Sequence, residues 1–296
     1  MTCLPRRRFI LGVAAAGLMP GSMKAADVHE PFAGRGRSVA VCFGSGGLHG
    51  YVHIGAIRAF QALGLKPDII AGTSVGAIAG ALWAAGHTAD EIETIADDPS
   101  WKESSGLRLP QLGIGRLDRL RDLIDRSTGG RPIEALPTRF AAVATDLDSG
   151  RPVVLDRGPA GPAVAASCSV PIRYEPVTVE GRRLVDGALS APVPVDAARE
   201  LGAGFVVAID VAYRPYEEPV SGFSDVAFQM FHIMVNRLID EQIRRADFAI
   251  RLDAHHRMSD EPYIPALVQA GDEAVRRRWP DLQRALGAAG IALPRS

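Results

Sequence analysis

Residues 69–80 read IIAGTSVGAIAG, and this stretch decides the fold. Apolar residues lead into G-T-S-V-G, with Ser74 at the centre, and small apolar residues follow. The pattern G-x-S-x-G after a strand is typical of a sharp strand-to-helix turn that presents a serine hydroxyl. Gly72 and Gly76 fit this turn, because side chains at their positions would clash in so tight a bend. The stretch therefore predicts a buried strand, a nucleophile at Ser74 and a helix over 75–85.

A glycine-rich turn lies upstream, where residues 40–50 read AVCFGSGGLHG. An apolar strand leads into it, and backbone N–H groups at the start of a following helix can bind developing negative charge. We predict that Gly46 and Gly47 form an oxyanion hole. The turn is not a dinucleotide-binding fingerprint, because the last glycine of G-x-G-x-x-G would fall on His49. The positions expected to support the site are Gly44, Ser45, His49, Gly50, Gly72, Gly76 and Gly187.

A serine nucleophile needs a base, and the residues by themselves offer two candidates. Asp186 stands in LVDGALSAPVPV, residues 184–195. Burial beside an apolar groove would make its carboxylate a stronger base than it is in water. His255 and His256 follow a late apolar run, where an ordinary α/β-hydrolase would place the histidine of a Ser-His-Asp triad. The pattern of residues leaves both arrangements open.

The composition is that of an ordinary globular protein. The 296 residues are 47% hydrophobic and 23% charged, with a formal net charge of −1. This length suits one large α/β domain with a buried core. The absence of a basic excess argues against a nucleic-acid partner. Cys42 and Cys168 are expected to be buried free thiols, because Cys42 lies in a predicted core strand.

The first 26 residues are typical of an export signal rather than of the folded domain. Arg6, Arg7 and Phe9 fit the twin-arginine pattern R-R-x-F, and the apolar run that follows is too short to span a bilayer comfortably. We predict recognition by the twin-arginine export machinery and a periplasmic location. An uncleaved signal would tether the protein to the membrane. The alternative is a basic, apolar first helix that stays on the protein.

The alternation of apolar runs with helical periodicity predicts a three-layer α/β/α fold with a largely parallel central sheet. Turn residues at 148–150 and 180–181 predict two hairpins. Residues 99–116 are expected to form an irregular, mobile cap over the site. The other expected strands cover 38–43, 69–71, 205–210 and 248–252, and the other expected helices cover 52–63, 117–124, 160–166, 195–201 and 224–246, with one that starts at a capping box over 88–91 and polar helices at the C-terminus.

The long helix expected over 224–246 carries an apolar face that includes Val226, Met230, Met234, Leu238 and Ile239. Methionine side chains could contact a lipid chain, but apolar residues at helical spacing more often pack in a core. We therefore expect this face to be buried.

The chain resembles the patatin-like phospholipases over residues 37–280, in several segments rather than in one motif. GSGGLHGYVHIGAIRAF, residues 44–60, is similar to the family's oxyanion loop and helix, and GTSVGAIAGALWAAG, residues 72–86, is similar to its nucleophile turn. FAAVATDLDSGRPVVLDRG followed by AVAASCSVPIRYEPV is similar to its middle segment. RLVDGALSAPVPVDAARELGA, residues 183–203, resembles its D-G-G/A block.

This resemblance implies hydrolysis of acyl esters in phospholipid, lysophospholipid or a simpler fatty ester, at a membrane or micelle surface and without metal or cofactor. It makes Ser74 the nucleophile and Asp186 the base of a Ser-Asp dyad, and it leaves residues 281–296 as a C-terminal extension. The loop has His49 where the family usually has arginine, and these side chains differ in fixed charge and reach. The alternative that this departure suggests is a catalytically silent lipid-binding protein of the same fold.

Overall fold

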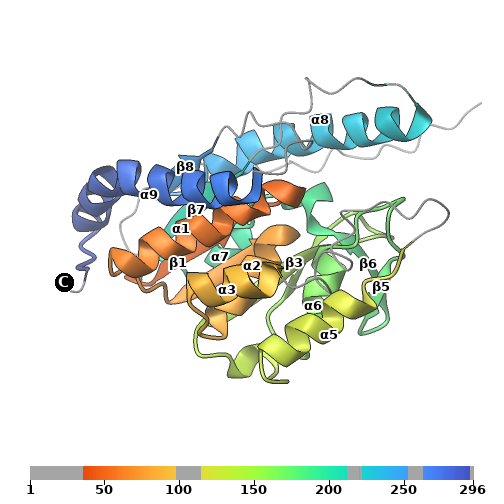
Figure 1. Ribbon diagram of the computed structural model, residues 1–296, viewed down its shortest axis with the longest axis horizontal. Helices are drawn as coiled ribbons and strands as arrows, with labels where there is room; N and C mark the ends of the chain where they lie inside the picture. The colour runs from red at the N-terminus through yellow and green to blue at the C-terminus, as the bar shows by residue number, and fades with distance from the viewer. Residues whose placement is uncertain (1–35, 98–114, 212–219, 221, 253–262, 294–296) are drawn as a thin grey trace, which may run out of the picture. The chain divides into compact units, whose positions relative to one another are not determined.

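A computed structural model describes residues 36–97, 115–211, 220, 222–252 and 263–293 (Figure 1). The predicted export signal at 1–26 lies outside these described residues, as do the predicted cap up to residue 114 and the pair His255 and His256.

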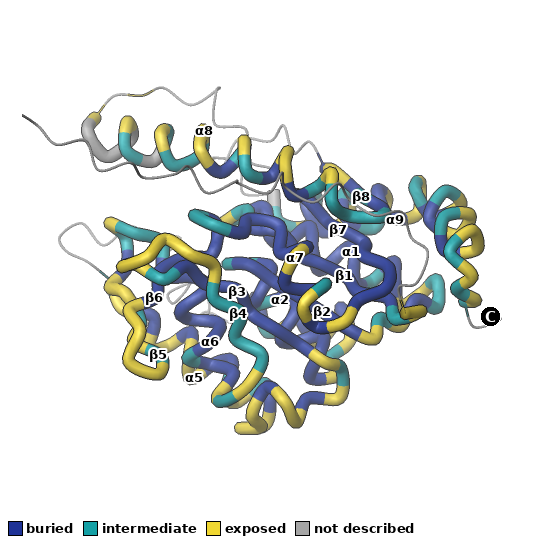
Figure 2. Tube along the Cα trace, turned by 180° about the vertical axis from the view of Figure 1, so that it is seen from behind, coloured by how far each residue is buried: buried dark blue, intermediate teal, exposed yellow. Residues whose placement is uncertain are grey.

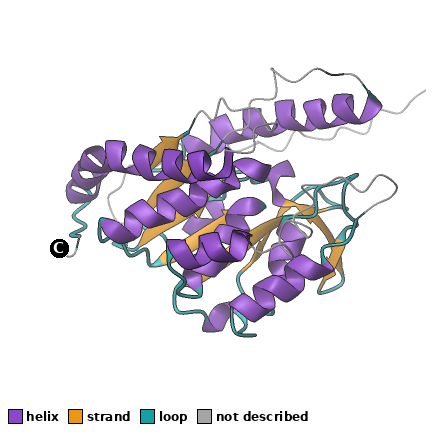
Figure 3. Cartoon of the chain, in the orientation of Figure 1, coloured by secondary structure: helices purple, strands orange, loops and turns teal. Residues whose placement is uncertain are grey.

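The centre of the fold is a mixed sheet, whose strands are orange in Figure 3. It has eight strands in the order β5-β6-β3-β2-β1-β7-β8, with β4 also paired to β3. The five neighbours from β3 to β8 run parallel, whereas β4, β5 and β6 pair antiparallel. Both predicted hairpins are confirmed as β3–β4 and β5–β6. The strands are β1 Val39–Phe43, β2 Ile69–Thr73, β3 Arg139–Asp146, β4 Pro152–Leu155, β5 Val177–Val179, β6 Arg182–Asp186, β7 Phe205–Asp210 and β8 Phe248–Arg251.

Helices cover both faces of this sheet, and the alternation of side chains along β1 shows which helices share a face. Val41 and Phe43 pack in one core with α1, α2, α3, α5, α6 and α9, whereas Ala40 and Cys42 pack in another with α7 and α8. The predicted three-layer α/β/α fold is confirmed. The helices are α1 Tyr51–Ala62, α2 Val75–Ala84, α3 Ala89–Asp97, α5 Asp118–Ser127, α6 Ala160–Ser167, α7 Val195–Glu200, α8 Phe223–Ile243 and α9 Tyr263–Ala288, with short 3-10 helices η1 Gly47–Gly50, η2 Ile133–Ala135 and η3 Gly187–Leu189.

The strands β1, β2 and β7 are buried along their whole length (Figure 2). Parallel strands covered on both faces read as continuous apolar runs, which is why the sequence shows them clearly. Cys42 and Cys168 are buried free thiols, as predicted. They pack in the cores on opposite faces of the sheet.

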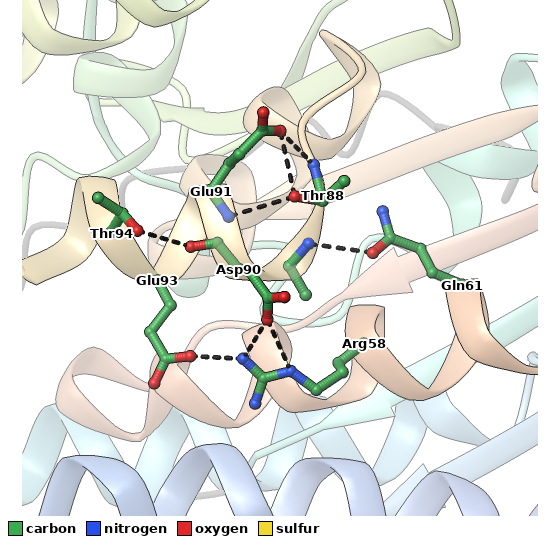
Figure 4. Close-up of polar contacts among 8 residues, drawn as sticks. Arg58, Gln61, Thr88, Asp90, Glu91, Glu93 and Thr94 are labelled. Atoms are coloured by element: carbon green, nitrogen blue, oxygen red, sulfur yellow. Dashed lines mark hydrogen bonds and ion pairs between the residues drawn. The ribbon is translucent and has the colours of Figure 1, made fainter.

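The start of α3 confirms the predicted capping box (Figure 4). The carboxylate of Glu91 accepts a hydrogen bond from the backbone N–H of Thr88 at 2.8 Å, and the Thr88 hydroxyl accepts one from the N–H of Glu91 at 3.3 Å. This reciprocal pairing satisfies N–H groups that a helix start leaves without partners. Arg58 of α1 pairs with Asp90 and Glu93 of α3, which ties the two helices together at the surface.

The C-terminal segment differs from the prediction of several polar helices, because residues 263–288 form the single helix α9. It lies against α1 at a crossing of small residues: a Cβ at Gly55 would come within 1.8 Å of the Val268 carbonyl oxygen. Leu282 and Leu286 are fully buried in the same core as the rest of the helix. The predicted boundary at residue 280 therefore falls inside a packed helix.

The prediction that the apolar face of α8 is buried is wrong for its N-terminal half. Val226 is 47% exposed, and Met230 and Met234 are each 59% exposed. Val235 and Ile239 pack on the sheet, with the partly buried Phe231 and Ile243 beside them. Apolar residues occupy a wider arc of this helix than the sheet covers, and periodicity alone does not show which part of the arc is covered. Within the described residues, no helix has both the length and the hydropathy to cross a membrane.

Candidate active site

Ser74 occupies the turn between β2 and α2 with φ 55° and ψ −126°, a conformation that L residues rarely adopt. Such a backbone costs on the order of 1–3 kcal/mol and persists only where the surroundings enforce it. Close backbone approach enforces it here. A Cβ at Gly76 would lie 2.3 Å from the Phe43 carbonyl oxygen, and a Cβ at Gly72 would lie 2.4 Å from the Gly76 carbonyl oxygen. This geometry is that of a nucleophile elbow.

The hydroxyl of Ser74 donates to Asp186 across a separation of 112 residues in sequence, with 2.7 Å between Ser74 Oγ and Asp186 Oδ2. Asp186 ends strand β6 and is 1% exposed. Its other oxygen accepts from the N–H of Ala188 at 2.8 Å. Gly187 is required between them, because a Cβ there would lie 2.1 Å from the Val143 carbonyl oxygen. The structure thus brings together the two side chains that were predicted to act as nucleophile and base.

Burial raises the pKa of Asp186 from its ordinary value of 3.8 to about 7, and the hydrogen bonds from Ala188 and Ser74 partly oppose this rise. An ionised carboxylate in an apolar site is poorly solvated, so it binds a proton more readily than in water. A base is most useful when its pKa lies near the working pH. The environment of Asp186 therefore suits proton transfer near neutral pH.

The N–H of Ser74 has a partner that the sequence did not reveal. It donates to Ser167 Oγ at 2.8 Å, and the Ser167 hydroxyl in turn donates to the Val143 carbonyl oxygen at 2.6 Å. Ser167 is fully buried at the end of α6. Nothing in the sequence signals this role, because a serine at the end of an alanine-rich helix is ordinary.

The glycine-rich loop between β1 and α1 is held by hydrogen bonds from three other parts of the chain. The N–H of Gly44 donates to the Ile209 carbonyl at 3.0 Å, and the N–H of Ser45 donates to the Pro192 carbonyl at 2.8 Å. His53 is buried in α1, and its Nε2 lies 2.8 Å from the Gly44 carbonyl oxygen. Because a carbonyl only accepts, His53 must donate from Nε2. Burial lowers the pKa of His53 to about 4, so the ring is neutral at physiological pH.

The predicted oxyanion glycines sit at the start of η1. Across the described part of the chain, the backbone N–H groups of Gly46 and Gly47 form no hydrogen bond, whereas that of His49 donates to the Gly46 carbonyl at 3.1 Å. The loop also packs directly on the elbow, since a Cβ at Gly50 would lie 2.0 Å from Val75 Cγ2. The loop and the nucleophile turn are therefore neighbours in space.

His49 is 1% exposed, so the residue that replaces the usual arginine lies inside the fold. The pKa of His232 on α8 falls to about 4, mainly through burial and further through the charges of His49 and Arg173. The effect of His49 places α8 close to the loop, and that of Arg173 places the segment before β5 close to α8. In the described ranges, no group of three or more His, Cys, Asp or Glu side chains is arranged to hold a metal ion.

Residues 41–199, more than half of the chain, match the family described as patatin-like phospholipase. This chain belongs to the patatin-like phospholipase family. The matched region includes both Ser74 and Asp186. The family assignment therefore rests on the same segment that builds the site.

Several curated proteins are similar to this patatin-like chain. An uncharacterized NTE family protein of Mycobacterium tuberculosis is 36% identical over 176 residues, which cover 58% of this chain and 49% of that protein. Lysophospholipase nte1 of Aspergillus fumigatus is 29% identical over 205 residues, which cover 64% of this chain and 13% of that protein. Patatin-like phospholipase domain-containing protein 7 of Rattus norvegicus is 30% identical over 200 residues, which cover 64% of this chain and 15% of that protein. The chain thus spans about half the length of its mycobacterial relatives and a small part of the eukaryotic ones.

Two solved structures resemble the chain more distantly. VipD from Legionella pneumophila gives a TM-score of 0.45 at 12% identity and covers 85% of this chain and 66% of its own. The ExoU–SpcU complex of Pseudomonas aeruginosa gives a TM-score of 0.49 at 16% identity, and the match covers 86% of this chain and 52% of the matched chain. The fold class itself rests on the sheet order and the helix layers described above.

Proposed function

We propose that this patatin-like protein is a serine acyl hydrolase that cleaves fatty-acyl esters of lipids with a Ser74–Asp186 dyad. The observation that carries the proposal is the 2.7 Å contact between Ser74 Oγ and a fully buried Asp186 carboxylate. A serine in a strained turn and a carboxylate whose pKa is about 7 meet the needs of a nucleophile and its base.

The proposed reaction has two halves. Ser74 Oγ attacks the ester carbonyl carbon while Asp186 takes the hydroxyl proton, and the carbonyl oxygen becomes an oxyanion near the N–H groups of Gly46 and Gly47. Asp186 then returns the proton to the departing alcohol, which leaves an acyl-serine. Water attacks this ester while Asp186 takes its proton, and Asp186 returns that proton to Ser74 Oγ as the bond to the acyl group breaks and the fatty acid is released. Each oxyanion donor contributes about 3 kcal/mol in comparable sites.

For the substrate we propose a phospholipid, a lysophospholipid or a simpler fatty ester, presented at a membrane or micelle. The names of the similar proteins support this choice, since they include a lysophospholipase and a patatin-like phospholipase domain-containing protein. Because those proteins extend far beyond the matched region, their names support the class of reaction rather than a particular head group.

Labelling with a fluorophosphonate, together with hydrolysis of a lysophospholipid micelle, tests the proposal. Ser74→Ala should abolish both labelling and turnover. Asp186→Asn should lower turnover by roughly 10²–10⁴-fold, because an amide cannot accept the proton. The double variant His255→Gln, His256→Gln should keep its activity. If that double variant is inactive and Asp186→Asn remains active, the base is a histidine and the dyad is wrong; an unlabelled wild type would favour a silent lipid-binding protein.

We propose further that the chain is exported in the folded state by the twin-arginine machinery and works in the periplasm. The sequence Arg6-Arg7-Arg8-Phe9 supports this proposal. Replacing Arg6 and Arg7 with lysine should leave the protein in the cytoplasm when cells are fractionated. Unchanged delivery to the periplasm would contradict it.

A further inference from the structure

Seven large apolar side chains are exposed in the described part of the chain, and they are not scattered. Four belong to the N-terminal half of α8, and three follow other elements near the site: the residues are Leu147, Ile172, Val220, Val226, Met230, Ile233 and Met234. Leu147 comes just after β3, and Val220 lies shortly before α8. The carboxyl ends of parallel strands meet at one edge of a sheet, and Ser74 follows β2 at that same edge.

The exposed residues of α8 form one face. Val226, Met230, Ile233 and Met234 follow one another at steps of four, three and one, so they lie on the same side of the helix. The sequence from 226 to 236 contains no Asp, Glu, Lys or Arg. The opposite side holds Val235, which packs on the sheet. An apolar face that meets a charge only at Arg237, at its C-terminal end, on a helix that is already anchored, needs an explanation other than core packing.

The helix that carries this face is held at the catalytic machinery by residues on its opposite, inward side. His232 lies in the same stretch of α8 and is close enough to His49 of the glycine-rich loop for their charges to interact. Further along α8, Gln242 donates to the Ser190 carbonyl at 3.0 Å and accepts from the N–H of Val193 at 2.9 Å. Both contacts fix the helix to the segment that follows Asp186. The exposed face is therefore carried by an element that is fastened to the site.

Ile172 is a further exposed apolar side chain, on a segment that lies close to α8. It is 66% exposed and has φ 74°, an outlier for a β-branched residue. Its neighbour Arg173 acts electrostatically on His232 of α8. The N–H of Asp186 donates to the carbonyl of Ser169 at 2.9 Å, so this short segment also borders the base. A strained backbone that holds an isoleucine out in water points to a contact that the isolated chain lacks.

We infer that Ile172 of this segment together with Val226, Met230, Ile233 and Met234 of α8 forms a docking face for the surface of a phospholipid bilayer or micelle. The inference rests on the proposed lipid hydrolase function, because a substrate held in a lipid aggregate must be reached from its surface. Side chains of this type insert at the boundary between head groups and acyl chains, with a strength that follows the buried apolar area. The lack of charge over 226–236 predicts that uncharged phosphatidylcholine surfaces suffice.

Sedimentation with phosphatidylcholine vesicles tests the docking face, with every protein carrying Ser74→Ala so that no lipid is consumed. Adding Met230→Gln and Met234→Gln should lower the vesicle partition coefficient at least tenfold, since glutamine keeps the length and helix propensity of methionine without its apolar character. Met230→Trp should raise it severalfold, because tryptophan favours the interface. Ala288→Gln, at an exposed position at the end of α9, is the control for an added surface glutamine and should not change the partition coefficient.

Equal partitioning of the glutamine double variant and its parent would overturn the inference, and so would an unchanged Met230→Trp variant. Analytical ultracentrifugation provides a second test of the inference. A dimer that dissociates when Met230 and Met234 are replaced by glutamine would show that a second copy covers this face, and would contradict the inference. Binding that needs phosphatidylglycerol and disappears at high salt would assign the contact to arginines instead. Because binding is measured without turnover, these outcomes stay separate from a failure of fluorophosphonate labelling, which concerns the hydrolase itself.

Discussion

The two turns that build the site are held in different ways. At the elbow, the glycines face main chain: a Cβ at Gly72 or Gly76 would come within 2.4 Å of a carbonyl oxygen. At the glycine-rich loop, a Cβ at Gly46 would first meet the side chain of Val211, and one at Gly47 would meet nothing within 4 Å. Backbone contact thus fixes the elbow, whereas the loop is bounded by side chains, of Val211 at Gly46 and Val75 at Gly50, and has open space at Gly47.

The glycine-rich loop is held in place by hydrogen bonds to segments that are remote in sequence. Ile209, Pro192 and His53 each bind the backbone of Gly44 or Ser45. A turn fixed by backbone contact tolerates almost no substitution, while a turn fixed by polar contacts can shift by small amounts when one contact is lost. We therefore expect changes at the elbow to affect folding and changes around the loop to affect mainly the rate.

The largest difference is expected between Gly76→Ala and Gly47→Ala. The first change brings a methyl group 2.3 Å from the Phe43 carbonyl oxygen, and main chain on both sides prevents relief. We expect little or no soluble folded protein. Gly47→Ala meets open space, and only its φ of 55° opposes it, at a cost of about 1 kcal/mol. Soluble yield and urea denaturation measure the stability of both variants. Equal stabilities would refute the expected difference between the elbow and the loop.

The second expected effect is the pH dependence that Asp186 confers. Its pKa rises from 3.8 to about 7 on folding, so its contribution to stability is fully present below pH 3.8, is lost between pH 3.8 and pH 7, and stays lost above. The loss amounts to about 4 kcal/mol at most. Asp186→Asn cannot ionise, so it should be more stable than wild type at pH 8, and the gap should shrink as the pH falls.

Ionisation of Asp186 should raise activity as the pH increases, whereas it lowers stability. The base works only when ionised, so kcat/KM should fall tenfold per pH unit below about pH 7. Thermal unfolding of both proteins from pH 4 to pH 8 and a pH–rate profile provide the two measurements. A stability gap that does not change with pH would show that Asp186 is not buried in its charged form.

A smaller effect is expected at Ser167, which supports the elbow by hydrogen bonding rather than by backbone contact. Ser167→Ala leaves the N–H of Ser74 and the Val143 carbonyl without their partner, which costs about 1–3 kcal/mol for a buried group. Both stability and kcat should fall. Ser169→Ala is the control, because the Ser169 hydroxyl donates only to the Ala165 carbonyl one turn back. If kcat falls equally in both variants, the bond to Ser74 has no special role.

The smallest effect is expected at His53, beneath the loop. His53→Phe keeps a ring against Phe43, whose centroid lies 5.0 Å away, but removes the donor to the Gly44 carbonyl. We expect a loss of about 1 kcal/mol in stability and a severalfold slower fluorophosphonate labelling. His87→Phe removes a similar bond, to the Ser127 carbonyl, away from the site. It should affect stability alone, and an equal drop in labelling for both variants would contradict a positioning role for His53.

Much of the architecture was readable from the sequence because its signals are local. Buried parallel strands produce continuous apolar runs, turn residues mark the hairpins, and Thr88 with Glu91 marks a helix start within four residues. The same locality shows Ser74, since the steric demands of the elbow fall on Gly72 and Gly76 beside it. The pairing of Ser74 with Asp186 came from the family resemblance instead, because residues 112 positions apart in sequence carry no local sign of contact.

Other features depend on what packs against each residue, and only the tertiary structure decided them. Met230 and Val235 are both apolar and lie on the same helix, yet one is exposed and the other is buried, because the sheet covers only part of the helical arc. Ser167 and His53 became parts of the site only when α6 and the glycine-rich loop met the elbow. Burial also decided the chemistry of Asp186: the sequence placed a carboxylate in a motif, but its pKa near 7 arises from surrounding segments that exclude water from it.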